Sequence, residues 1–330
     1  MKVFHGLDSV TPALTASSLT IGNFDGMHRG HQRIVAQTIR LAADAGAPAV
    51  ALTFEPHPLD IVAPERAPSR LTVLSEKLDQ LAAAGIDVTV VARADRALLA
   101  LTPEQFAGRI VERLHPTYIV EGASFGFGRG RSGTTETLRK LGPGHGFEVF
   151  VVDPVQVHLD SDTVVDISSS LIRRLLTDGQ VHRAAECLGR PYALAGEVVT
   201  GARRGVRLGF PTANIDVGGQ LVPADGVYAG TARLAVDSPA GAGQWPAAVS
   251  IGSTPTFQES GEQIQRRVEA HLLDADPDTD LYGQEIRLDF GVRLRGQERF
   301  ESPDGLQAQI ARDVEAVRRY TRGESSRLEP

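Results

Sequence analysis

Residues 18–45 place the strongest constraint on how this chain can fold, because they join a short apolar segment, a glycine-rich turn and an amphipathic helix. The turn, residues 22–31, reads Gly-Asn-Phe-Asp-Gly-Met-His-Arg-Gly-His, and apolar residues then recur at helical spacing. His28 and His31 are three positions apart, so they share one face of the first helical turn. Helix N-termini attract anions through unpaired N–H groups, and Gly30 leaves room for a phosphate to approach. The segment therefore predicts a strand–turn–helix unit that binds a polyphosphate, which would favour the charged form of both imidazoles.

The first half of the chain alternates between strand-like and helix-like segments. Short β-rich runs lie at 50–54, 88–92, 118–120 and 148–152, and amphipathic helical patterns lie at 73–84 and 103–114. This alternation predicts an α/β domain with a doubly wound parallel sheet and helices on both faces. In such sheets, ligands bind at the carboxyl ends of the strands. We therefore expect the turn at 22–31 to meet the loops at 54–58 and 121–133, which also follow strands.

From residue 189 onward, the pattern changes to short β-rich runs separated by Gly, Pro and Asp. These runs lie at 194–199, 226–235, 247–251, 268–273 and 286–294, and a helical pattern follows at 306–320. That spacing predicts a small antiparallel β-barrel with a terminal helix. Two helices, at 168–176 and 181–188, precede it. We expect an N-terminal domain at 1–187 and a C-terminal domain at 188–330.

Length and composition limit the class of protein. A chain of 330 residues with 42% hydrophobic and 23% charged residues is typical of a two-domain globular protein. The net charge of −7 and the aromatic content of 5% argue against a nucleic-acid-binding barrel, which relies on basic and stacking residues. Cys187 is the single cysteine, the N-terminus lacks the apolar run of a signal peptide, and no segment reaches membrane-spanning length. We expect a cytoplasmic protein that binds neither nucleic acid nor a membrane; the sequence leaves its oligomeric state open.

Residues 128–133 match the dinucleotide-binding pattern G-x-G-x-x-G, and Asp153 follows at the spacing of a ribose-binding acid. A dehydrogenase is therefore an alternative. However, the preceding strand ends near Glu121, whereas the motif needs a tight strand-to-helix turn. The following helix also looks short, because Gly-Pro-Gly at 142–144 is expected to break it. We favour an anion-binding loop that carries two arginines.

The turn at 22–31 contains H-x-G-H, the motif of the nucleotidylyltransferase superfamily. Its full string resembles the flavin adenylyltransferase half of the bacterial bifunctional riboflavin kinases/FAD synthetases. Three further motifs extend the resemblance: Phe-Glu-Pro-His-Pro at 54–58, Gly-Ala-Ser-Phe-Gly-Phe-Gly at 122–128 and Ile-Ser-Ser-Ser-Leu-Ile-Arg at 167–173. The resemblance implies that His28 and His31 are catalytic. It also implies ATP or phosphate binding by Gly22, Asn23, Phe24, Gly30, Ser168, Ser169 and Arg173, and flavin binding by Phe54, Pro56, His57, Pro58, Ser124, Phe125 and Phe127.

These motifs also have structural explanations. Two prolines around His57 make a stiff loop, and the serines of 167–173 can cap a helix without excluding phosphate binding. Ser124 replaces the family's usual carboxylate or amide, and Gly126 stands where a bulkier residue is common. An alternative function is therefore a riboflavin kinase or flavin-binding regulator whose adenylyltransferase site is impaired.

The second domain carries motifs that resemble the riboflavin kinase family. These are Gly-Ala-Arg-Arg-Gly at 201–205, Pro-Thr-Ala-Asn at 211–214 and Val-Glu-Ala-His-Leu-Leu-Asp at 268–274. The resemblance implies phosphate binding by Gly201, Arg203 and Gly205, Mg²⁺ ligation by Thr212 and Asn214, and catalysis by Glu269. Hard oxygen donors suit Mg²⁺, which takes few protein ligands and several from phosphate and water.

The strand pattern at 268–274 separates polar from apolar side chains. Glu269 and His271 alternate with Val268, Ala270 and Leu272, so the two sets face opposite sides. Alternation alone fits a solvated outer face, where most glutamates lie. Together with the resemblance, it makes Glu269 our candidate for the base that accepts the proton of a ribityl hydroxyl.

The two domains suit two different nucleophiles. The hydroxyl of riboflavin is neutral and benefits from a base, whereas the phosphate of FMN is already ionised and needs alignment and charge neutralisation. We therefore predict a two-step enzyme. Riboflavin and ATP give FMN and ADP at the C-terminal barrel, and FMN and ATP give FAD and pyrophosphate at the N-terminal domain. The expected ligands are riboflavin, FMN, FAD and ATP with Mg²⁺.

Overall fold

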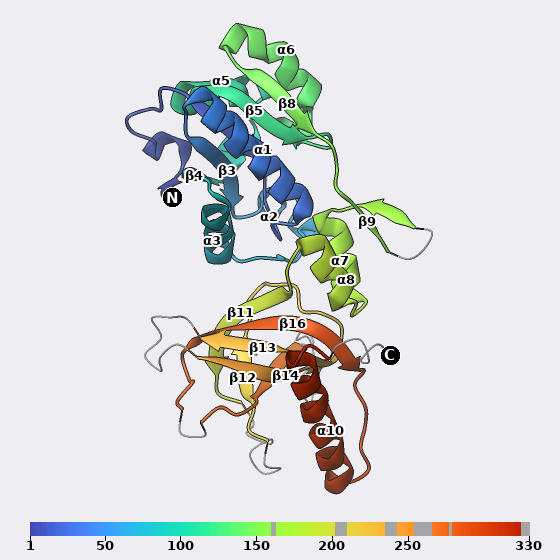
Figure 1. Cartoon of the computed structure of the whole chain (residues 1–330). Helices are drawn as coiled ribbons and strands as arrows, with labels where there is room; N and C mark the ends of the chain where they lie inside the picture. Colours follow the sequence, from blue (N-terminus) through green and yellow to red (C-terminus); the bar gives the residue numbers. More distant parts are fainter. Residues whose placement is uncertain (160–162, 202–209, 235–242, 254–265, 277–278, 325–330) are drawn as a thin grey trace. The chain divides into compact units, whose positions relative to one another are not determined.

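The computed structural model describes residues 1–159, 163–201, 210–234, 243–253, 266–276 and 279–324. The chain divides into two compact units, Met1–Ser169 and Ser170–Pro330 (Figure 1). The domain boundary that we expect at 187/188 lies further along the chain than this division and stays a prediction.

The first unit is built on a six-stranded sheet in which all neighbouring strands are parallel, as predicted. Its strands are β1 (Lys2–His5), β2 (Ser17–Ile21), β3 (Ala49–Glu55), β4 (Val88–Arg93), β5 (Pro116–Gly122) and β8 (Glu148–Val152). They lie in the order β1-β4-β3-β2-β5-β8. The chain winds from β2 to β3 and β4 on one side, and later adds β5 and β8 on the other. Ligands bind where such winding reverses, which is here between the carboxyl ends of β2 and β5.

Helices cover both faces of this sheet, so the doubly wound fold is confirmed. The helices of this unit are α1 (Arg29–Ala45), α2 (Pro58–Val62), α3 (Leu74–Ala84), α4 (Arg96–Leu99), α5 (Pro103–Leu114) and α6 (Thr135–His145). On one face, Val35 of α1 and Leu81 of α3 pack in a cluster with Ala51 of β3. On the other face, Ile110 of α5 packs in a cluster that contains Leu52 of β3.

Helix α6 corrects one expectation, because the Gly-Pro-Gly sequence does not break it. Gly142 and Pro143 lie in its last turns, and the Gly146 N–H closes on the Gly142 carbonyl at 2.8 Å. A proline removes one backbone donor and is costly in the middle of a helix, whereas this one lies close to the end. The helix therefore continues to His145.

The G-x-G-x-x-G pattern lies in a hairpin, not at a strand-to-helix turn. Its glycines fall within and between β6 (Gly126–Phe127) and β7 (Gly133–Thr134), which pair antiparallel. A second small hairpin, which was not predicted, is formed by β9 (Gln156–His158) and β10 (Val164–Asp166). These glycines lie in a hairpin and not in a tight turn between a strand and a helix, so the segment does not support dinucleotide binding.

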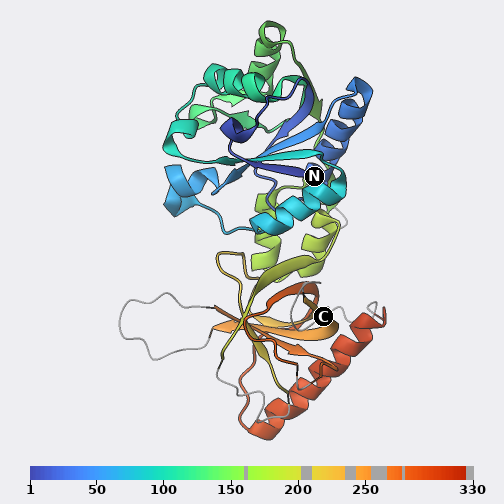
Figure 2. The same ribbon diagram turned by 90° about the vertical axis from the view of Figure 1, so that its left-hand side faces the viewer.

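The second unit contains a closed antiparallel barrel, as predicted. Its strands are β11 (Tyr192–Val199), β12 (Ala213–Asp216), β15 (Arg266–Leu272), β14 (Gln244–Ser253), β13 (Gly226–Leu234) and β16 (Glu285–Arg295), in this order around the barrel. Tyr228 and Phe290 pack edge to face at 5.4 Å and are fully buried. Its helices are α7 (Ser169–Thr177), α8 (Val181–Leu188) and α10 (Pro303–Thr321). Helix α10 lies along the outside of the barrel (Figure 2), where Val317 packs with Ala229.

Candidate active sites

The turn at 22–31 brings the two predicted imidazoles into contact. His28 is the N-cap of α1, and its Nδ1 accepts a hydrogen bond from the His31 N–H at 3.3 Å. The two rings stack with their centroids 3.6 Å apart. Gly30 permits this arrangement, since a Cβ there would lie 3.1 Å from the His28 ring. The glycine therefore makes room for the histidine pair in addition to any phosphate.

His31 is half-buried at the start of the helix. The edge of Phe24 packs against its ring at 5.5 Å, and its Nδ1 is buried without a hydrogen-bond partner among the described residues. Burial lowers the pKa of His31 well below its usual value, and the nearby His28 and Lys77 act in the same direction. Without ligand, His31 is therefore neutral at pH 7. The positive charge that the sequence suggested would require bound phosphate, and phosphate contact by His31 stays a prediction.

Asp25 anchors this turn, and the sequence alone did not single it out. Asp25 is 8% exposed, and its carboxylate accepts hydrogen bonds from the N–H groups of Leu71, at 2.9 Å, and Thr72, at 3.0 Å. Thr72 in turn accepts from the Gly26 N–H, and the Ser169 hydroxyl donates to the Asp25 carbonyl at 2.8 Å. An aspartate in a glycine-rich turn looks like an ordinary turn residue. Only the fold shows that it joins three distant segments.

The Phe-Glu-Pro-His-Pro segment lies beside the same turn, as expected for loops at adjacent strand ends. Phe54 belongs to β3 and packs against the core, and Pro58 begins α2. His57 caps α2 through its Nδ1, and its Nε2 lies 3.0 Å from the amide nitrogen of Asn23. The segment thus caps α2, a role that the sequence did not predict. Flavin contact by these residues and Pro56 stays a prediction.

The three residues of the loop at 122–128 that are predicted to bind flavin differ in how deeply they are buried. Phe127 is 6% exposed and packs against Phe106, with ring centroids 5.9 Å apart, so its ring belongs to the core. Phe125 stacks on it and is half-buried, while Ser124 is exposed. Arg131 fills the space beside this loop. Its guanidinium donates to the Ser124 carbonyl at 3.3 Å and would lie 3.1 Å from a Cβ at Gly126.

The other residues predicted to contact phosphate are Gly22, Ser168 and Arg173. Gly22 follows β2, and a Cβ there would lie 3.2 Å from the Phe24 ring. Ser168 is exposed before α7, and Arg173 lies within α7, in the second unit. Their contacts to phosphate stay predictions.

In the second unit, strand register brings the predicted kinase residues together. Asn214 of β12 is directly opposite Glu269 of β15. Glu269 is half-buried, whereas Val268 and Ala270 face the barrel interior, so the predicted alternation is observed. Ser250 of β14 lies opposite Glu269 on its other side. Directly paired residues share a face, so an amide, a carboxylate and a hydroxyl form a row on the outside of the barrel.

Two predicted residues of this site lie outside the part of the chain that the structure describes, Arg203 and Gly205. Gly201 is described and lies against the Asn214 side chain, which a Cβ at Gly201 would overlap. Thr212 is half-buried one residue before β12 begins. Among the described residues, no group of three or more His, Cys, Asp or Glu side chains could hold a metal ion.

Two family models match this chain, FAD synthetase over residues 11–170 and riboflavin kinase over residues 188–321. The bifunctional riboflavin kinase/FMN adenylyltransferase of Escherichia coli (strain K12) is 36% identical over 97% of this chain and 98% of its own length. The protein of the same name from Pseudomonas fluorescens is 34% identical over 96% of this chain and 97% of its own. The chain belongs to the bifunctional riboflavin kinase/FMN adenylyltransferase family.

A solved structure from Streptococcus pneumoniae, named a macrolide-efflux protein, is also similar. It has a TM-score of 0.81 and 28% identity, and it covers 96% of this chain and 99% of that chain. No helix in the described part of this riboflavin kinase/FMN adenylyltransferase family member is both long enough and apolar enough to cross a membrane. The FAD synthetase match includes the turn with His28 and His31, and the riboflavin kinase match includes Asn214 and Glu269.

The adenylyltransferase half also contains a buried acid that sequence analysis used only to mark a strand end. Glu121 of β5 is 3% exposed, and its carboxylate accepts a hydrogen bond from the Ile21 N–H at 2.6 Å. Ile21 is the last residue of β2, so the contact bridges the two strands where the sheet winding reverses. Burial raises the pKa of Glu121 well above its usual value. A single acidic residue in an apolar run gives no signal of this role.

We expect Glu121→Gln to stabilise this enzyme, compared with the wild type, more at pH 8 than at pH 5. A carboxyl whose pKa is raised on folding binds more protons in the folded state than in the unfolded state. Its contribution to stability is therefore complete below the pKa of the unfolded state and is lost as pH rises through the pKa of the folded state. Glutamine stays neutral, so its melting temperature is expected to exceed that of the wild type by about 2–4 °C at pH 8, the shift that about 1 kcal/mol produces in a domain of this size. Thermal unfolding at both pH values measures this. The exposed Glu148→Gln is the control, and a gain that is equal at both pH values would contradict the argument.

Proposed function

We propose that this enzyme phosphorylates riboflavin on the outer face of its barrel. The register that places Asn214, Glu269 and Ser250 side by side is the observation that carries this proposal. Glu269 accepts the proton of the ribityl hydroxyl while the hydroxyl oxygen attacks the γ-phosphorus of ATP. The O–H bond breaks, a new P–O bond forms, and the bond to ADP breaks. FMN and ADP are the products.

The donors at the start of β12 fit a magnesium ion. Thr212 and Asn214 offer hard oxygens, and Mg²⁺ takes most of its other ligands from phosphates and water. Gly201 leaves the Asn214 side chain the room that a larger residue would take. We assign Thr212 and Asn214 as the residues that would hold Mg²⁺, with Gly201, Arg203 and Gly205 near the phosphates. When bound, the ion neutralises charge on the transferring phosphate.

We assign the second step, adenylylation of FMN, to the turn at 22–31. An oxygen of the FMN phosphate attacks the α-phosphorus of ATP, a P–O bond forms, and pyrophosphate leaves. Because this oxygen is already ionised, the site needs donors that align and neutralise the phosphates. The N-terminus of α1 with His28 and His31 supplies them, and the adjacent segment at 54–58 supports a flavin position beside it.

A product assay tests both assignments. The purified protein is incubated with riboflavin, ATP and Mg²⁺, and FMN and FAD are separated by chromatography. We expect FMN to accumulate first and FAD to follow. Formation of FMN alone would favour the alternative that Ser124 and Gly126 suggested, a kinase with an impaired adenylyltransferase site. Absence of both products would contradict the proposal.

We further propose a cytoplasmic location. The single cysteine supports it, because proteins of reducing compartments rarely depend on disulfides. Fractionation of cells that express the protein, followed by immunodetection, tests this location.

A further inference from the structure

The row on the outer face of the barrel contains a hydroxyl that the proposed reaction has not yet used. Ser250 is the direct partner of Glu269 in the β14–β15 ladder. Side chains paired in this way have Cβ atoms about 4.5–5.5 Å apart on the same face. One small group can therefore contact both residues at once.

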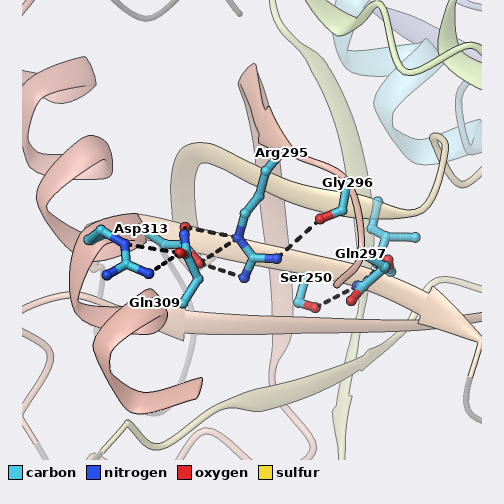
Figure 3. A network of polar contacts seen from close by, with 8 residues as sticks. Ser250, Arg295, Gly296, Gln297, Gln309 and Asp313 are labelled. Atoms are coloured by element: carbon cyan, nitrogen blue, oxygen red, sulfur yellow. Dashed lines mark hydrogen bonds and ion pairs between the residues drawn. The ribbon is translucent and has the colours of Figure 1, made fainter. Parts of the chain in front are cut away.

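Gln297 fixes the role of the Ser250 hydroxyl. Its side-chain Nε2 donates to the Ile251 carbonyl at 2.7 Å and to Ser250 Oγ at 3.3 Å (Figure 3). Gly252 permits this approach, because a Cβ there would lie 2.9 Å from the Gln297 nitrogen. Since Oγ already accepts a hydrogen bond, the proton of Ser250 is left to donate to another group.

The segment that leads to Gln297 is tied to the terminal helix through Arg295. Arg295, two residues earlier, forms a two-pronged ion pair with Asp313 of α10, with nitrogen–oxygen distances of 3.1 and 2.8 Å (Figure 3). The two side chains are 14% and 8% exposed, and Gln309 adds a hydrogen bond to Asp313 at 2.9 Å. Arg295 also donates to the Gly296 carbonyl at 3.1 Å. Buried pairs with this geometry hold one arrangement, so the segment that carries Gln297 is pre-organised.

We propose that Ser250, oriented by Gln297, is a positioning residue for the hydroxyl of riboflavin that is phosphorylated. This proposal rests on the proposed role of Glu269. An alcohol is both a donor and an acceptor, and the row offers a matching pair. The alcohol donates its proton to Glu269 and accepts from Ser250, and its other lone pair points at the γ-phosphorus.

Kinetics of FMN formation by the full-length chain test the pair. We expect Ser250→Ala to lower kcat/KM for riboflavin about tenfold, the loss of one hydrogen bond in the transition state, with KM for ATP within twofold. Ser250→Thr keeps the hydroxyl and is expected to recover most of this loss. Thr231→Ala removes a hydroxyl from β13 of the same barrel and is the matched control. Melting temperatures of all variants report folding.

A double-mutant cycle shows whether Gln297 acts through Ser250. Gln297→Ala alone is expected to lower kcat/KM severalfold. Added to Ser250→Ala, the same substitution is expected to lower kcat/KM by less than a further twofold. The proposal that Ser250 and Gln297 act as a pair would be overturned if their losses in kcat/KM multiply in the double variant. It would also be overturned if Ser250→Ala has the kcat/KM of the wild type.

Glu269→Gln, measured in parallel, separates this proposal from the one on which it rests. If Glu269→Gln is inactive while Ser250→Ala matches the wild type, only the pair is wrong. If Glu269→Gln keeps full activity, the function assigned to the whole row fails as well.

Discussion

The His31→Ala variant is expected to convert riboflavin to FMN at the wild-type rate and to form FAD at least about a thousandfold more slowly. His31 stacks on His28 at the N-terminus of α1, and its Nδ1 is buried. We therefore expect its Nε2 to be the ring atom that contacts phosphate. Alanine removes this donor and also opens a gap beside Phe24, so the charge that develops on the phosphates loses a fixed partner. His28→Ala removes both the helix cap and the stack, and we expect a similar loss of FAD formation.

The measurement compares the two steps on the same protein. FMN formation is followed with riboflavin and ATP, and FAD formation with supplied FMN and ATP. His5→Ala changes an exposed histidine at the edge strand β1 and controls for the loss of an imidazole. Equal losses of both activities in His31→Ala would refute the assignment of this residue to the adenylyltransferase step.

The Glu269→Gln variant is expected to show the reverse pattern. Glutamine has nearly the same shape but accepts no proton, so FMN formation is expected to fall about 10²–10⁴-fold, the range that a general base contributes. Adenylylation of supplied FMN is expected to stay near the wild-type rate, since that reaction uses the other unit. Product quantification at saturating ATP checks both rates.

Glu285→Gln is the matched control for this prediction. Glu285 is an exposed strand residue of β16, so the same substitution there is expected to leave both activities unchanged. Unchanged kinase turnover in Glu269→Gln would remove this carboxylate from the mechanism. The opposite effects of the histidine and glutamate variants together would locate the two steps in different units.

The architecture was largely predictable because periodicity reports which faces of an element are buried. Alternating strand and helix patterns indicated the parallel sheet, and short β-rich runs indicated the barrel. Strand β12 was missed because Ala213–Asp216 is only four residues long and partly polar. Helix α6 extends further than predicted, because its proline lies close to the helix end.

For the candidate sites, the sequence predicted a set of residues but not how these residues are arranged or which partners hold them. His28, His31, Asn214 and Glu269 stood out through motifs, whereas Glu121 and Ser250 belong to no motif and Asp25 lies in one that gave it no role. Those residues act through partners that are remote in sequence. Asp25 binds the backbone at residues 71 and 72, and Glu121 binds the end of another strand.

By itself, the sequence determined the two kinds of unit, the histidine-bearing turn and the carboxylate on a polar strand face, because local spacing sets which side chains share a surface. Tertiary structure alone decided which side chains meet across strands. Winding of the sheet placed Glu121 beside β2, and barrel register placed Ser250 beside Glu269. Register and winding order depend on the packing of the whole unit, and a shift by one residue would turn Glu269 into the barrel interior.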